Sequence, residues 1–526
     1  MVVSVNQILS LFNEGKYKEA RNLLPEIDTP SSVFFEAVIH NFFGNFNKAL
    51  EALEKVNVEE LTPNHELYYH SALAETFYRR YEFDKMSKCC RIAKDRIRED
   101  ISKDQEQLFW ESNVFLYEGY YTGLMGHYKE SIESLTQYMN YARQLGYPTF
   151  IARAYNVIGE SFTDMRDYEK GLELLELGYN KVKEIPGSVS RAAILTNIGN
   201  VYEKRGDLRK AEKYYKDSIE AYQLTEYPGN GYLPELKLGD LNLNKGELES
   251  AEIVFTNILY TGVDRGYKIQ ESLALFSLAL VCKRKGEFQR ALDFLERTYV
   301  IQTKLDSAIN ISDTLIEIIK VTGYLKLKDK LLEYLEKLKE LSDQEGNPII
   351  ETRYRLARGL MLKSESRLKD KLESQKIFQD IAYDPALEEL DIKNQALINL
   401  CELLLFEIRS SHDSSLLGEI YTYLDQIQDH SVINRSVIIK LEIQFLRAKF
   451  LIAENRVVEG IELLNNVYNE TEEIGLEEIR ERASSELQKI RSEVEMIQNM
   501  NSKNVMEEEK MKSIEEYLTE LGRLLR

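Results

Sequence analysis

The amino-acid sequence predicts an all-α fold, a solenoid of antiparallel helix pairs that ends in a capping helix. Three observations predict it: turn residues that recur every 40 residues, helical hydrophobic periodicity on both sides of each turn, and only nine prolines in 526 residues. One compact core is excluded, because single cores stop growing at about 250–300 residues. Stacked repeats avoid this limit, since each repeat contacts only its neighbours.

The recurring turn follows one sequence pattern: a turn residue, a hydrophobic residue two positions later and a small residue five positions later. The turn residues are Gly126, Arg166, Gly206, Gly246 and Gly286, 40 residues apart. The hydrophobic residues are Tyr128, Tyr168, Leu208, Leu248 and Phe288, and the small residues are Ser131, Gly171, Ala211, Ala251 and Ala291. Glycine accepts the left-handed conformation that often ends a helix, so each turn is predicted to join two helices.

The segments on both sides of each turn carry apolar residues at helical spacing. Around Gly206 these residues are Ile194, Ile198, Val201 and Tyr202 before the turn, and Leu208, Ala211, Tyr215 and Ile219 after it. Small residues at Gly199 and Ala211 would let the two helix backbones approach closely. One pair cannot bury its apolar face alone, whereas stacked pairs can. We expect about twelve pairs over residues 1–475.

The C-terminal end differs from the repeats. Residues 476–500 are predicted to form a capping helix, with apolar residues at Leu476, Ile479, Ala483, Leu487, Ile490, Val494 and Ile497. The opposite side is charged, as the exposed end of a solenoid requires. Residues 501–526 predict a second amphipathic helix, which would dock on the cap or in the solenoid's groove. Binding to another chain, self-inhibition and partial disorder remain alternatives for it.

Composition excludes several classes of function. The net charge of −20, from 88 acidic and 68 basic residues, argues against a nucleic-acid groove. Four cysteines are too few for a disulfide framework and fit a reducing compartment. No apolar run approaches the roughly 18 residues of a membrane helix, and no secretory signal is visible. We therefore expect no membrane insertion and a cytoplasmic location.

Motifs that carry chemistry are missing from the sequence. His65 and His70 are five residues apart, whereas a helical zinc motif needs a spacing of four. Cys89 and Cys90 are interpreted as buried small hydrophobic residues. No phosphate-binding loop, dinucleotide fingerprint or nucleophile elbow is found. We therefore expect no catalytic residue, no metal and no cofactor, and predict that the protein is not an enzyme.

Two stretches resemble the tetratricopeptide repeat. They are Ala193-Ile-Leu-Thr-Asn-Ile-Gly-Asn-Val-Tyr202 with Gly206-Asp-Leu-Arg-Lys-Ala211, and Ala154-Tyr-Asn-Val-Ile-Gly159 with Asp167-Tyr-Glu-Lys-Gly171. The family's usual period is about 34 residues. The longer period here is similar to that of kinesin light chain and of the sensor region in MalT-type regulators. The resemblance implies a right-handed superhelical solenoid whose first helices line a concave groove that binds peptides or helices.

The resemblance also selects candidate partner-binding residues, by counting the family's groove-facing positions from each turn. They are Asn113, Tyr117, Tyr120, Arg153, Asn156, Glu160, Asn197, Asn200, Lys237 and Asp240. An asparagine amide can bond both the N–H and the C=O of a peptide backbone. Tyrosine adds apolar area with a hydrogen-bonding tip. The alternative for each residue is ordinary solvated helix surface.

We therefore predict a scaffold or adaptor that binds a peptide or helical segment of a neutral to basic partner protein. The alternative is a regulatory sensor module resembling the MalT-type repeat region, which would act on separate effector proteins. The family's clamp for a C-terminal carboxylate is incomplete here. Asn197 and Lys237 match that clamp, but Asn156, Glu160 and Leu233 do not.

Removing residues 501–526 should leave a folded solenoid, because the capping helix before them already closes the last repeat. The truncated and full-length chains should have the same midpoint of thermal unfolding by circular dichroism. Aggregation of the truncated chain would show instead that these residues are part of the cap.

Overall fold

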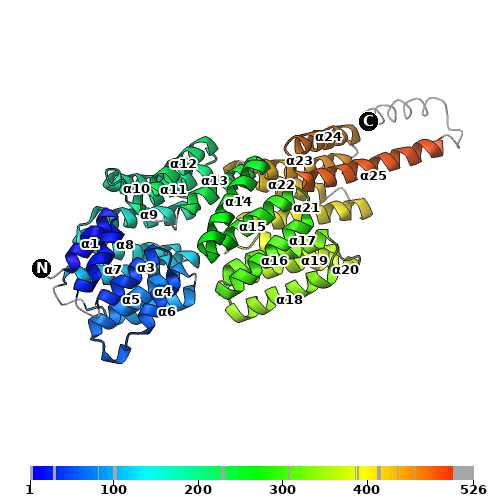
Figure 1. The fold of residues 1–526 in the computed structure, drawn as a ribbon. Coiled ribbons are helices and arrows are strands. Elements are labelled where there is room, and N and C mark those ends of the chain that lie inside the picture. The colour runs from blue at the N-terminus through cyan, green and yellow to red at the C-terminus, as the bar shows by residue number, and fades with distance from the viewer. Residues whose placement is uncertain are drawn as a thin grey trace. The chain divides into compact units, whose positions relative to one another are not determined.

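The computed structural model describes residues 4–27, 31–80, 82–98, 103–226, 231–305, 308–385, 387, 390–411, 416–434, 436–454 and 456–501. Regular structure in these residues consists of helices, 25 of them α-helices, without a strand (Figure 1). The predicted all-α class is confirmed. Residues 502–526, which make up nearly all of the predicted last amphipathic helix, lie outside the described residues.

In the described residues the α-helices follow one another as twelve pairs and one final helix. The first six pairs are α1 (Val5–Glu14) and α2 (Tyr17–Leu23), α3 (Ser31–Phe42) and α4 (Phe46–Glu54), α5 (Pro63–Arg79) and α6 (Phe83–Lys94), α7 (Gln105–Leu124) and α8 (Tyr128–Leu145), α9 (Pro148–Asp164) and α10 (Tyr168–Val182), and α11 (Val189–Lys204) and α12 (Leu208–Gln223). The next six are α13 (Tyr232–Lys245) and α14 (Leu248–Arg265), α15 (Lys268–Arg284) and α16 (Phe288–Leu305), α17 (Ala308–Tyr324) and α18 (Lys328–Glu345), α19 (Pro348–Ser364) and α20 (Leu368–Ala382), α21 (Leu390–Ser411) and α22 (Leu417–Asn434), and α23 (Val437–Ala453) and α24 (Val457–Glu473). The final helix is α25 (Glu477–Asn501), which covers the segment predicted as the cap.

The turns adopt the left-handed conformation that their glycines predict. The φ angles are 79° at Gly126, 78° at Gly206, 80° at Gly246 and 72° at Gly286. Arg166 and Lys326 take the same conformation, with φ of 63° and 57°, although they carry side chains. Lys326 continues the 40-residue series by one more repeat. The conformation is thus imposed by the helix pairing, and glycine only makes it easier to reach.

Glycines in the first helix of several pairs allow close contact with the second helix. A Cβ atom added at Gly119 would lie 2.6 Å from Cγ of Leu135, sixteen residues later. One added at Gly199 would lie 2.5 Å from the ring of Tyr215, again sixteen residues later. Ala211 is fully buried between the same two helices. The close approach expected at Gly199 and Ala211 is therefore present.

The chain divides into two compact units. Unit 1 comprises Met1–Leu241, Tyr260–Glu271 and Gln302–Ser307, and unit 2 comprises Asn242–Leu259, Ser272–Ile301 and Ala308–Arg526. Each unit has its own buried apolar clusters. Each is described separately below.

Unit 1 turns back on itself, so that its first helices contact α9, α11 and α12 (Figure 1). Oδ1 of Asn13 accepts hydrogen bonds from the backbone N and Oγ1 of Thr149, at 3.2 and 2.9 Å. The backbone N of Lys18 donates to Oε2 of Glu226 at 2.8 Å. The ring of Phe42 packs in one cluster with residues of α11 and α12. These contacts join residues that are more than 100 positions apart in the sequence.

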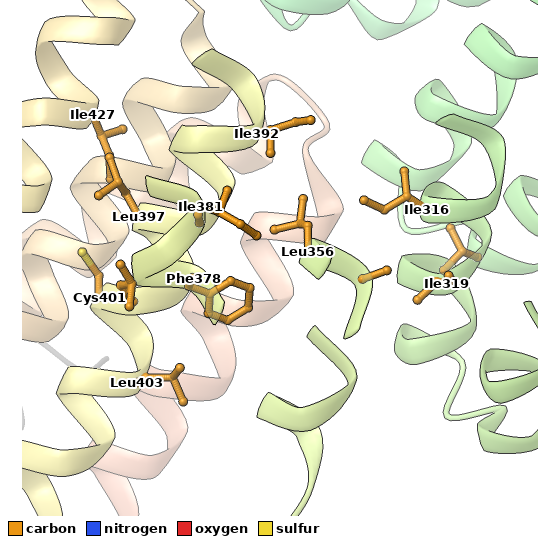
Figure 2. Close-up of a cluster of buried hydrophobic side chains, with 14 of the residues drawn as sticks. Ile316, Ile319, Leu356, Phe378, Ile381, Ile392, Leu397, Cys401, Leu403 and Ile427 are labelled. Carbon is orange, nitrogen blue, oxygen red and sulfur yellow. The ribbon is translucent and has the colours of Figure 1, made fainter. Parts of the chain in front are cut away.

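Unit 2 has one continuous aliphatic core that runs through successive pairs. Figure 2 shows part of it, where Leu356 of α19 lies between Ile316 and Ile319 of α17 on one side and Phe378 of α20 on the other, with Leu397 and Cys401 of α21 beyond. Within the described part of the chain, no helix is both long and apolar enough to cross a membrane.

Gly199→Ala should lower the free energy of unfolding by about 1 kcal/mol. The clash with Tyr215 lowers the free energy of unfolding by about 1–3 kcal/mol, and the better helix propensity of alanine raises it by about 1 kcal/mol. Gly323→Ala in α17 is the matched control, because the nearest atom to its added Cβ is 3.8 Å away. It should stabilise the chain by up to about 1 kcal/mol. Urea denaturation of both variants measures the difference, and equal shifts would contradict the close-contact explanation.

Candidate functional site

Unit 1 contains a hollow of about 930 Å³. Its walls come from the turn after α3, from the ends of α5 and α7, and from α8, α9, α11 and the start of α13. Residues 265–270 and 304–305 of the same unit complete the walls. Because the first helix pairs fold over, the inner surface of unit 1 forms a bounded hollow at this point.

Three asparagine side chains form a hydrogen-bonded row along one wall, called here the asparagine ladder. Nδ2 of Asn197 donates to Oδ1 of Asn156 at 3.1 Å, and Nδ2 of Asn200 donates to Oδ1 of Asn197 at 3.0 Å. The hydroxyl of Tyr215 lies 2.9 Å from Oδ1 of Asn200, from the second helix of the pair. Asn156 and Asn197 line the hollow directly. The ladder therefore holds amide groups at fixed positions on the wall.

Carboxylates lie beside the ladder. Glu160 lines the hollow, and the surrounding protein atoms together with Asp164 raise its pKa to about 7, against the opposing effect of Lys204 and Lys237. Asp164 is itself held by Nζ of Lys204 at 2.7 Å. Burial also raises the pKa of Asp240 to about 6, although Lys237 opposes the shift. This end of the wall is acidic, with part of its charge balanced by lysine.

Other residues on the lining are aromatic and cationic. The rings of Tyr78 and Tyr120 stack with their centroids 4.8 Å apart and 12° between their planes. Arg79 and Arg80 also line the hollow. Arg80 is engaged by Glu82 and Asn47, which fixes the position of its guanidinium. The hollow therefore offers amides, carboxylates, aromatic rings and basic groups on its lining.

The predicted site residues divide into two groups. Tyr120, Asn156, Glu160 and Asn197 line the hollow. Asn200 is the next step of the ladder, and Lys237 and Asp240 of α13 act electrostatically on the same carboxylate cluster.

The remaining three predicted residues do not line the hollow. Asn113 is 4% exposed and Tyr117 is fully buried, because α5, α6 and α8 pack against α7. Arg153 is half-buried, and its Nη2 lies 3.5 Å from the hydroxyl of Tyr117. These three residues face the packed interior of unit 1.

Sequence reasoning missed part of the lining. Tyr78 and Arg79 lie in the last turn of α5 and line the hollow. The 40-residue series of turns begins at Gly126, after these residues, so counting from those turns did not include them. Residues 265–270 carry no such signal, since they reach the wall only through the fold of the unit.

The histidines and the vicinal cysteines lie outside this site. Burial lowers the pKa of both His65 and His70, and it raises the pKa of the Cys89 thiol to about 12. These groups are therefore uncharged near neutral pH. In the residues that the structure describes, no three His, Cys, Asp or Glu side chains are placed to hold a metal ion.

Comparison with known families identifies the repeats. Two family models, each described as tetratricopeptide repeat, match residues 150–223 and 274–304. The chain contains tetratricopeptide repeats. The first match spans α9 to α12 and therefore includes the whole asparagine ladder. The resemblance predicted from the sequence is confirmed over these two segments.

Solved structures with helical repeats are similar at low sequence identity. A Rap protein complexed with Competence and Sporulation Factor has a TM-score of 0.48 and 12% identity, over 70% of this chain and 99% of that one. A signal transduction ATPase with a tetratricopeptide repeat sensor, from Pyrococcus horikoshii, has a TM-score of 0.44 and 14% identity, over 70% of this chain and 52% of that one. No curated protein sequence matches the chain.

The raised pKa of Glu160 predicts a pH dependence of stability. The folded chain binds a proton at Glu160 below about pH 7, whereas the unfolded chain binds it only near the ordinary value of 4.5. This contribution should therefore make the folded state more stable as the pH falls from about 8 to about 5. Glu160→Gln removes the titrating group and should lose this part of the pH dependence.

Urea midpoints of the wild type and of Glu160→Gln at the two pH values provide the measurement. Glu173→Gln, at an exposed position on α10, is the control and should keep the wild-type dependence. An unchanged pH dependence in Glu160→Gln would show that this carboxyl does not titrate near neutral pH.

Proposed function

We propose that this protein is a non-enzymatic adaptor that binds a short peptide segment of a partner protein in the hollow of unit 1. The asparagine ladder is the observation that supports this proposal most directly. Ladder amides placed on the wall of a hollow provide fixed hydrogen-bonding groups of the kind that an extended peptide backbone needs.

The ladder has hydrogen-bonding capacity beyond its own contacts. Each asparagine amide has two N–H groups and an oxygen with two lone pairs. The ladder engages one N–H group of Asn197 and one of Asn200. Asn197 also interacts with the Glu160 carboxylate. A peptide that lies along Asn156 and Asn197 would use the remaining groups through its own N–H and C=O, which gives binding without strict sequence selection.

The volume of the hollow suits a peptide segment. At about 930 Å³ it is near the upper end of the roughly 300–1,000 Å³ range of ligand sites.

The net charge of the chain, rather than the lining of the hollow, favours a peptide of neutral to basic character. The basic side chains on the lining are Lys48, Arg79, Arg80, Arg265, Lys268 and Lys304, and the acidic ones are Glu82, Glu160 and Asp164. Glu160 and Asp164 would attract a lysine or arginine side chain of the peptide, and Tyr78 and Tyr120 would pack against an apolar one. The net charge of −20 also raises the rate of encounter with basic partners at low salt.

A double variant tests the ladder. Asn197→Ala with Asn200→Ala should weaken the binding of selected peptides by about tenfold or more, because each lost hydrogen bond contributes about 0.5–1.5 kcal/mol. Peptides would first be selected on the wild-type protein from a random phage-displayed library. Their dissociation constants for both proteins would then be measured by fluorescence anisotropy.

A matched control carries the same substitutions outside the hollow. Asn140→Ala with Asn180→Ala changes exposed asparagines on the second helices α8 and α10, and should leave peptide binding unchanged. Both double variants should keep the wild-type thermal midpoint. If the ladder variant binds the selected peptides as tightly as the wild type, the site assignment is wrong.

A further inference from the structure

Two side chains of α25 reach the helices of unit 2 that are distant in sequence. Oε2 of Glu478 lies 2.6 Å from Nη1 of Arg284 on α15, and Oε1 of Glu478 accepts a hydrogen bond from the Tyr324 hydroxyl on α17 at 2.8 Å. Glu478 itself is only 6% exposed. Burial opposes its charged form, but Arg284 and Lys283 outweigh this effect and keep its pKa below the ordinary value.

Arg482, one helical turn later, makes the complementary contacts. Its guanidinium donates to Glu442 on α23 and to Oε1 of Glu402 on α21, the latter at 3.0 Å. It also lies over the Phe445 ring, 4.8 Å from the centroid. Glu402 is in turn paired with Lys363 of α19. Two residues of α25 are therefore linked to α15, α17, α19, α21 and α23.

These five helices are the first members of their pairs, the helices that line the binding surface in tetratricopeptide repeats. We call the face that bears Arg284, Tyr324, Glu402 and Glu442 the inner face of unit 2. The inner face of unit 2 is thus covered by α25 of the same chain.

The turn before α25 fits closely against two other turns of unit 2. A Cβ added at Gly246 would lie 3.2 Å from Cδ1 of Ile474, and one added at Gly286 would lie 2.9 Å from Cγ of Glu477. Glycine at these two 40-residue turns therefore leaves room for the segment that begins α25.

The charges on the inner face restrict what can replace α25. Without α25, Arg284 would lose its ion pair with Glu478. The carboxylates of Glu402 and Glu442 would lose the ion pairs that both make with Arg482. Leaving partly buried charges unpaired is strongly unfavourable, so a replacing helix must supply the same two charges one turn apart.

The fit of α25 is also incomplete. Oε2 of Glu442 is buried without a hydrogen-bond donor among the described residues. A helix whose arginine engages both oxygens of Glu442 would satisfy a group that α25 leaves unsatisfied, because arginine pairs with carboxylates through two parallel hydrogen bonds.

We propose that the inner face of unit 2 is a second binding surface, which accepts a partner helix carrying a carboxylate and an arginine one turn apart, and that α25 occupies this surface until such a helix displaces it. This proposal is independent of peptide binding in unit 1.

A peptide of residues 476–492, labelled with fluorescein, is the probe. In the wild type α25 competes with the probe. Only the small fraction of molecules in which α25 has left the inner face can bind it, so the apparent affinity is lowered in proportion to that fraction. The full-length variant Glu478→Ala with Arg482→Ala weakens that competition and should bind the probe at least about tenfold more tightly than the wild type. Arg480→Ala is the matched control on α25, because Arg480 pairs with Glu472 and Glu477 of its own hairpin. It should bind the probe like the wild type.

A charge-swapped probe tests the chemistry of the surface. A peptide carrying arginine at 478 and keeping arginine at 482 should not bind the double variant, because its new arginine meets Arg284. It should gain binding when Arg284→Glu is added to that variant, which restores an opposite-charge pair. Equal binding of the normal and swapped probes, or equal affinity of the wild type and the double variant for the normal probe, would overturn the proposal.

Hydrogen exchange on the unmodified chain keeps the test decisive if the double variant fails to fold. Saturating unlabelled peptide should speed exchange of backbone amides in residues 477–487 and leave those of α23 unchanged. Unchanged exchange in residues 477–487 would also overturn the proposal.

Discussion

The close contact between the two helices of a pair is the constraint on which the rest of the structure depends. A single pair cannot bury its apolar face, so it is stable only when its neighbours cover it. Gly119, Gly159 and Gly199 each leave too little space for a Cβ, because a large side chain sixteen residues later fills it. This contact keeps the pairs thin, and thin pairs can stack repeatedly and present their first helices side by side.

The first helices of the pairs lie side by side and form an inner face in each unit. The two inner faces differ in the groups that they carry. In unit 1 the inner face carries the asparagine ladder beside charged groups such as Glu160 and Asp164, and these residues line a hollow. In unit 2 it carries ionised groups that pair with Glu478 and Arg482 of α25. Partly buried charges require partners, and α25 supplies them in unit 2.

The local structure was largely predictable from the sequence. The 40-residue interval marked the turns, and the small residues around Gly206 marked the helix contact. The register also placed Asn156, Asn197 and Asn200 on one face, where the structure joins them in a ladder. Such features depend on residues within about one repeat of each other, and hydrophobic periodicity reports that range directly.

The sequence by itself thus determined the helices, their pairing, the left-handed turns and the row of asparagines. Only the tertiary structure decided that Asn113 and Tyr117 are buried, that Tyr78 lines the same hollow as Asn156 and Asn197, and that Glu478 meets Arg284. These outcomes depend on how far each unit curves back on itself. That curvature is the sum of small rotations between many pairs, and no short stretch of sequence encodes such a sum.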